Sequence, residues 1–138
     1  MKRVLLLLLA LGTLTGLTGT AAASNAAVVI PFEKHWVGPG HYVGTACGNG
    51  AIDMQLSDSS VTGNVQHFTA TVQLACADGT LTAVLDGRFN FSTGRTVLNG
   101  FVAEGWLAGA EVHEEGQLVG LDPLTFVGTV QLMPGSAG

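Results

Sequence analysis

Three polar residues at alternate positions, Glu111, His113 and Glu115, form the first candidate for a chemical site. In a β-strand they would share one face, and two carboxylates with an imidazole can bind a divalent metal that activates water. The same pattern is typical of a strand whose polar face lies in water, because the opposite face carries Trp106, Ala108, Ala110 and Val112. We expect the solvated face, and we therefore predict no metal and no cofactor.

Two further polar groups could take part in chemistry. His35 and His41 flank a Gly-Pro-Gly turn and could meet across a hairpin. Asp86, Arg88 and Asn90 alternate, so one strand face would carry all three, either as a strip outside the protein or as the lining of a polar lumen. We expect both groups on the outside, where cross-strand pairing stabilises polar side chains.

Short catalytic motifs are missing from the chain. It contains no Gly-x-Ser-x-Gly elbow, His-Glu-x-x-His helix, Cys-x-x-Cys pair or phosphate-binding loop. A serine or cysteine nucleophile also needs a base close by in space, which the order of residues does not give. No catalytic residue is assigned, and the sequence favours a protein without catalysis while leaving the question open.

The first 23 residues have the three parts of a secretory signal peptide. A charged start is followed by a leucine-rich stretch and by the small-residue site Ala21-Ala22-Ala23, so we predict cleavage after Ala23. A membrane anchor is the alternative, but the apolar stretch 4–17 has about 14 residues and a spanning helix needs roughly 20. The sequence therefore predicts a secreted, periplasmic or cell-envelope protein that does not insert into a membrane after cleavage.

The mature chain would be strongly acidic. Cleavage removes Lys2 and Arg3, which leaves three Lys and Arg residues against ten Asp and Glu residues, a net charge of −7 with His neutral. Such a surface repels phosphate backbones, so a nucleic-acid partner is excluded and a small apolar ligand is the partner that we consider.

Cys47 and Cys76 are the only cysteines, and their surroundings match. Each lies two residues before an Asn-Gly or Asp-Gly turn, so each would end a strand at the tip of a hairpin. Two cysteines in an oxidising compartment usually pair. A structural disulfide between them is the expectation, with a reactive or metal-binding thiol pair as the alternative.

Beyond the signal peptide, apolar and polar residues alternate with a period of two, which predicts β-strands. Turn signals rich in glycine separate these strands, among them Asp78-Gly79 and Glu115-Gly116. The strands that we expect cover residues 28–37, 41–45, 51–56, 68–76, 80–91, 96–103, 106–114 and 124–133.

Eight strands joined by short turns predict an all-β domain. We expect a single antiparallel eight-stranded up-and-down β-barrel over residues 24–133, with a β-sandwich as the alternative and a disordered tail at 134–138. Gly87 would mark a bend or bulge in the longest strand. A candidate set of aromatic residues would fill the core or line an apolar lumen: Trp36, Phe68, Phe89, Phe91, Phe101, Trp106 and Phe126.

The strand at 80–91 gives the clearest assignment of faces. Leu81, Leu85, Phe89 and Phe91 are expected to be buried. Asp86 and Arg88 fall on the other face and are expected to stay exposed, because burying an unpaired charge is costly.

The glycine spacing and strand rhythm of the second half resemble those of the allene oxide cyclase and dirigent-like barrels. The residues that carry this resemblance are Gly87-Arg88-Phe89-Asn90-Phe91, Gly94-Arg95, Asn99-Gly100 and Gly128-Thr129-Val130. The resemblance implies an eight-stranded antiparallel barrel with a hydrophobic lumen. It also implies relatives that shape a reactive chain by steric confinement, but it carries no active-site residue over to this chain.

Three functions follow from this reading. The first is a binding barrel without catalysis that holds a small apolar ligand or is simply a stable extracellular module. The second is a cyclase or isomerase that works by confinement in the lumen. The third is an adhesive or assembly subunit that uses an open sheet edge.

Overall fold

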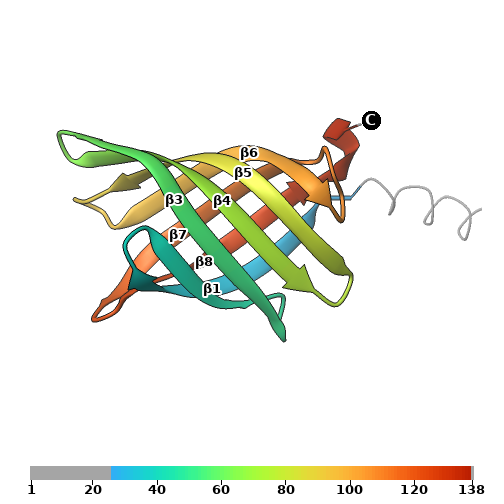
Figure 1. The fold of residues 1–138 in the computed structure, drawn as a ribbon, viewed down its shortest axis with the longest axis horizontal. Coiled ribbons are helices and arrows are strands. Elements are labelled where there is room, and N and C mark those ends of the chain that lie inside the picture. The colour runs from blue at the N-terminus through green and yellow to red at the C-terminus, as the bar shows by residue number, and fades with distance from the viewer. Residues whose placement is uncertain (1–25, 138) are drawn as a thin grey trace, which may run out of the picture.

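The computed structural model describes residues 26–137 and is a closed antiparallel β-barrel (Figure 1). Its strands follow the chain around the barrel and are β1 (Val28–Gly38), β2 (His41–Ala46), β3 (Gly50–Thr62), β4 (Val65–Cys76), β5 (Gly79–Asn90), β6 (Arg95–Gly105), β7 (Glu111–Leu121) and β8 (Leu124–Met133).

Closure comes from pairing between the first and the last strand. β1 runs antiparallel to β8, with Ile30 opposite Val130 and Phe32 opposite Gly128. Every other strand pairs with its neighbours in the sequence. The barrel is therefore confirmed over the sandwich, and its ring of strands has no free edge within residues 26–137.

The interior is filled by one face of each strand. Most inward-facing side chains are apolar and at most 6% exposed; those with the largest buried volumes include Ile52, Val72, Leu74, Leu81, Leu85, Leu98, Val130 and Leu132. Burial of this surface is the main force that holds the barrel together.

The face assignment at 80–91 is largely confirmed. Leu81 and Leu85 are each 1% exposed, while Asp86 and Arg88 are exposed on the outside. Phe89 is half-buried against the core, and the prediction is wrong for Phe91, which is 52% exposed. Phe91 follows the last residue of β5, so its side chain lies beyond the end of the barrel.

Several glycines, among them Gly44, Gly100 and Gly128, let neighbouring strands approach closely. A Cβ at Gly44, Gly100 or Gly128 would overlap a backbone carbonyl oxygen of the adjacent strand. Glycine kinks of this kind help a sheet to curve into a barrel. Gly87 has a different role from the one expected, because pairing runs through it without a shift and the Phe68 ring packs where its Cβ would be.

The seventh strand begins later than the sequence predicts. Residues 106–110 form a turn in which Leu107 and Gly109 have φ angles of 60° and 88°, and such left-handed backbone interrupts a strand. The expected turn at Glu115-Gly116 is also wrong, since both residues lie inside β7. Gly116 is an inward position crowded by Thr96, so it is a packing glycine.

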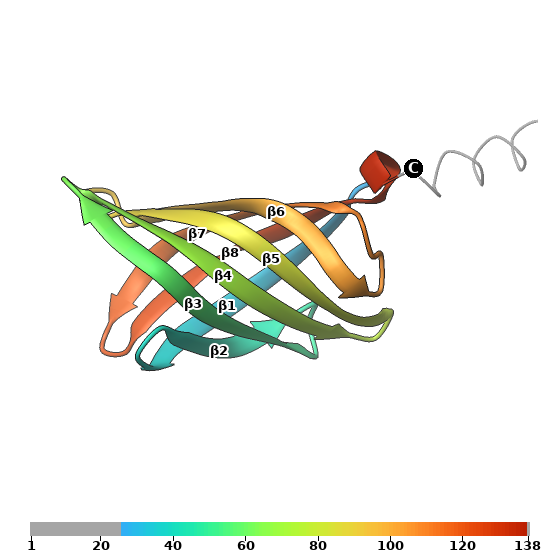
Figure 2. The same ribbon diagram turned by 45° about the horizontal axis from the view of Figure 1, so that its top comes forward.

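The two ends of the barrel differ (Figures 1 and 2). One end, which we call the open end, carries the hairpins β1–β2, β3–β4, β5–β6 and β7–β8. The other, the closed end, carries the remaining turns and the C-terminal segment. There the Cys47–Cys76 disulfide joins the β2–β3 and β4–β5 turns, with 5.9 Å between Cα atoms, which confirms the predicted pairing.

The C-terminal segment adds a short element at the closed end. Pro134–Ala137 forms a 3₁₀ helix, η1, where we expected a disordered tail. The φ angle fixed by proline suits the start of such a turn. Among residues 26–137, no helix has the length and apolar character needed to cross a membrane. The predicted signal peptide lies outside the described residues.

Candidate functional site

A narrow recess enters the barrel at its open end. Its wall is formed by side chains of seven strands, all except β7, namely Lys34, Tyr42, Met54, Leu56, Gln66, Phe68, Phe89, Thr96, Leu98 and Phe126. The aromatic rings of this wall pack edge to face, with 5.8 Å between the Tyr42 and Phe126 centroids and 5.4 Å between those of Phe89 and Phe126. Apolar side chains with a few polar groups among them are typical of small-molecule sites.

The recess is small. The empty space between its walls, measured out to the open mouth, is about 310 Å³. Only about 20 Å³ of this space can hold the centre of a water molecule. One water needs roughly 10–15 Å³ on that measure. The rest of the barrel interior is packed with side chains, so the recess accepts the slim end of a ligand and does not enclose a bulky one.

Four exposed apolar side chains surround the mouth, and we call them the crown: Trp36, Val61, Phe91 and Leu121. Each belongs to a different hairpin of the open end. Their exposed fractions are 43%, 60%, 52% and 76%. Large apolar side chains that remain in water around a recess are a common mark of a binding surface.

Pairing connects the crown to the recess. Trp36 lies opposite Tyr42 and Val61 lies opposite Gln66, and both partners line the recess. Leu121 lies opposite Leu124, which packs against the core. Since paired residues point to the same side of a sheet, these crown residues continue the inward-facing rows beyond the end of the barrel.

Phe91 completes the crown in the same way. Its ring centroid lies 5.0 Å from that of Phe89, edge to face, and Phe89 lines the recess. The Phe91 amide donates a hydrogen bond to the carbonyl of Asn64 in the β3–β4 hairpin. Phe91 therefore bridges two hairpins at the mouth.

Of the seven aromatic residues predicted to line the lumen, three line the recess and four lie elsewhere. Phe68, Phe89 and Phe126 line the recess as expected. Trp36 and Phe91 were expected inside but belong to the crown, because their positions in the inward rows lie past the end of the barrel.

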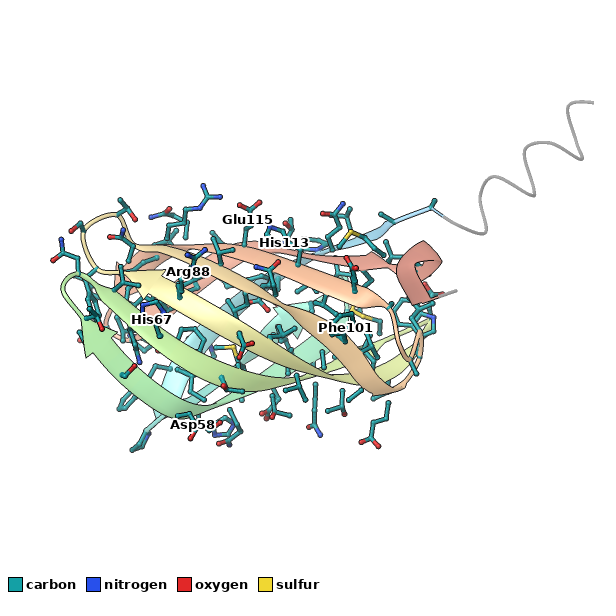
Figure 3. All side chains as sticks on the ribbon, turned by 90° about the horizontal axis from the view of Figure 1, so that it is seen from above. Asp58, His67, Arg88, Phe101, His113 and Glu115 are labelled. Carbon is teal, nitrogen blue, oxygen red and sulfur yellow. A yellow bond between two sulfur atoms is a disulfide. The ribbon has the colours of Figure 1, made fainter. Side chains whose placement is uncertain are left out.

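The other two lining predictions fail for different reasons. Phe101 is 58% exposed on the outer wall of β6, opposite Val84 and Glu111, because its position has the outward parity of the strand (Figure 3). Trp106 packs against the core in the β6–β7 turn, directly over Gly79, and so covers the closed end rather than the recess.

Lys34, which lines the recess, forms an ion pair with Glu114, which does not line it. The Lys34 ammonium donates a hydrogen bond to Glu114 Oε2, and the two side chains are 2% and 0% exposed. Lys34 Nζ also lies 3.3 Å from the sulfur of Met54 and 4.7 Å from the centre of the Phe32 ring. Two buried charges of opposite sign leave the interior neutral, and removing either would leave the other uncompensated.

Two oxygen atoms beside this pair have no partner. Glu114 Oε1 and Thr96 Oγ1 are both buried and accept or donate no hydrogen bond within residues 26–137. An unsatisfied buried polar group costs about 1–3 kcal/mol. The two residues point inward from adjacent strands, with Thr96 opposite Gly116 and Glu114 opposite Leu98. Thr96 lines the recess and Glu114 does not, so the hydroxyl of Thr96 is the unused hydrogen-bonding group that faces the recess.

The Tyr42 hydroxyl adds a polar group to the recess. Burial raises the pKa of the Tyr42 phenol above its ordinary value of 10.0, because the charged phenolate loses solvation there. The side chain is thus a neutral hydroxyl throughout the physiological range.

Sequence reasoning missed Lys34 and Glu114, although the signal was present. Lys34 falls on the same alternating face as Ile30 and Phe32, and Glu114 falls on that of Val112. A single charge on each of two apolar faces indicates a buried pair. The sequence does not show that the two faces meet, since the residues are 80 positions apart.

The polar candidates from the sequence lie on the outer wall (Figure 3). Glu111, His113 and Glu115 project from the outer face of β7, and no set of three metal-binding side chains occurs in the part of the chain that the structure describes. His113 Nδ1 lies 2.7 Å from Asn99 Oδ1, and Arg95 donates to Glu115. These contacts are the cross-strand pairs of a solvated surface.

The remaining polar candidates are also apart from the recess. His41 lies 3.2 Å from the Asp53 carboxylate, and its backbone partner in β1 is Gly38, so it does not face His35. Asp86 and Arg88 are exposed on β5, and Asn90 caps the turn after it through its side-chain oxygen. They form an outer strip and not a polar lumen.

Comparisons of the chain with protein families, with curated proteins and with solved structures give no significant match.

Proposed function

We propose that this protein is a binding barrel without catalysis that takes the slim apolar end of a small ligand into the recess at its open end. The observation that carries the proposal is the crown, which extends the apolar inner face of the barrel into water around the mouth of the aromatic-lined recess. Leaving four large apolar side chains exposed is costly unless something covers them.

The disulfide-linked turns and the predicted signal peptide support a place outside the cytoplasm. The Cys47–Cys76 bond is consistent with an extracellular or otherwise oxidising location. We propose a secreted or cell-envelope protein, where a carrier of apolar molecules would meet its ligand in water.

The two other functions have less support. Catalysis by confinement needs a closed space the size of the folded substrate, and the recess offers about 20 Å³ to water centres. The resemblance to allene oxide cyclase-like barrels stays a prediction. Assembly through an open sheet edge would need an unpaired edge strand, and the ring of strands in residues 26–137 is closed.

Titration of the mature protein with Nile red, a neutral apolar dye, tests the proposal. We expect saturable binding with a blue shift of the dye emission. Phe91→Ala should weaken binding several-fold because it removes one side of the mouth. Phe101→Ala is the matched control, since this aromatic is 58% exposed on the outer wall and should leave binding unchanged. Absence of saturable binding, or equal losses in the two variants, would overturn the proposed function.

A further inference from the structure

We propose that the inner end of the recess recognises a neutral hydrogen-bonding group, the hydroxyl of a long-chain alcohol, carried by the apolar ligand. This inference rests on the proposed binding function and names the ligand class. Within the described residues, three polar or charged side chains are buried, Lys34, Thr96 and Glu114.

The charges at this place cancel. Lys34 donates to Glu114 Oε2, and neither side chain has contact with bulk water. A ligand ammonium would lie beside Lys34, which lines the recess, and would be repelled, whereas a ligand carboxylate would meet an ammonium whose charge Glu114 already neutralises. A neutral group avoids that repulsion and the cost of moving a charge out of water.

The unused hydrogen-bonding capacity fits a hydroxyl. Thr96 lines the recess, and its unpartnered Oγ1 can donate or accept, whereas Glu114 does not line the recess. An alcohol hydroxyl supplies one donor and one acceptor, so it can bond to Thr96 Oγ1 in either direction and satisfy what the protein leaves open there. An ester or ether can only accept from Thr96.

The space is also of the right size. The recess is open to water centres over about 20 Å³, which is room for about one water molecule. A hydroxyl group is about the size of one water molecule and can take its place there. The alkyl chain attached to it would lie along Tyr42, Phe89 and Phe126 toward the crown. The ligand that fits is therefore linear, apolar along its length and hydroxylated at its inner end.

Calorimetric titration of the mature protein with n-decanol, decanoate and decylammonium at neutral pH tests this inference. The three ligands share one alkyl chain and differ only in the head group. We expect decanol to bind about tenfold more tightly than either ion, because only the ions lose solvation without a free counter-charge. Decanoate binding as tightly as decanol would overturn the inference while leaving the binding function in place.

A matched pair of variants separates recognition by the protein from the general cost of desolvating an ion. Thr96→Val keeps the shape of the side chain and removes its hydroxyl, so the affinity for decanol should fall several-fold. Thr71→Val makes the same change on the exposed outer face of β4 and should leave all three affinities unchanged. An unaltered affinity for decanol in Thr96→Val would overturn the inference, whereas failure of all three ligands to bind the native protein would overturn the proposed function itself.

Discussion

Lys34 and Glu114, which are 80 residues apart in sequence, form an ion pair buried inside a mainly apolar barrel. Removing one partner of a buried pair leaves an uncompensated charge and typically costs about 3–5 kcal/mol. We expect Lys34→Met to lower the free energy of unfolding by that amount in urea denaturation. The double variant Lys34→Met/Glu114→Leu should recover most of the loss, because well-packed apolar side chains replace such pairs at little cost. A double variant as unstable as the single one would show that the pair does more than neutralise charge.

A methyl group at Gly128 should destabilise the barrel. Its Cβ would overlap the carbonyl oxygen of Glu115 on β7, and backbone has to shift to make room. We expect Gly128→Ala to lower the free energy of unfolding by about 1–3 kcal/mol. Gly38→Ala is the control, since nothing lies within 4 Å of a Cβ there. Equal stability of the two variants in thermal unfolding would contradict close strand approach at Gly128.

The disulfide should contribute through the unfolded chain. Cys47 and Cys76 are separated by 29 residues, and a closed loop of that length is worth about 3–4 kcal/mol in the chain-entropy model. Replacing Cys76 by Ala should lower stability by roughly 2–4 kcal/mol. Intact mass before and after reduction should differ by about two hydrogens. Quantitative labelling of both thiols in the native, unreduced protein would refute the bond.

Phe89 and its neighbour Arg88 should respond very differently to truncation. Phe89 is half-buried in the wall of the recess, so Phe89→Ala should cost about 2–3 kcal/mol, below the range for a fully enclosed Phe, and should widen the recess for bulkier ligands. Arg88 is exposed, so Arg88→Ala should change stability by less than about 0.5 kcal/mol. The opposite order in urea denaturation would mean that the two faces of β5 are exchanged.

Tyr42 should make stability depend on pH in the alkaline range. Its folded-state pKa is raised above 10.0 by burial, so the unfolded chain releases the phenolic proton first. This contribution is fully present below pH 10 and is lost as the pH rises through the folded-state pKa. Because Tyr42 is the only tyrosine, the ultraviolet absorbance of phenolate reports it directly, and the midpoint should lie above 10.0. Tyr42→Phe should remove the corresponding loss of stability.

Alternation and turn chemistry were enough to predict most of the barrel. The faces of β5 follow from period-two alternation, which acts over a few residues. The pairing of Cys47 with Cys76 follows from their matching turns and from their being the only two cysteines. Where strands end depends on backbone geometry that the pattern does not carry. This is why the start of β7 and the inward position of Gly116 were missed.

The site was less predictable than the fold. Phe68, Phe89 and Phe126 were expected in the lining and are there. Trp36 and Phe91 occupy inward-facing positions in the alternation along their strands. The alternation does not show at which residue the wall of the barrel ends. The meeting of Lys34 with Glu114 depends on closure of the barrel, which brings together strands that are distant in the chain.

The crown is divided among four separate hairpins, and the backbone ladder that holds the barrel does not depend on their side chains. Each hairpin can therefore change in length or composition while the wall below it stays intact. Stability and selectivity are encoded by different residues in this chain. The open end could be randomised, one loop at a time, to obtain barrels with new ligand preferences from a single unchanged frame.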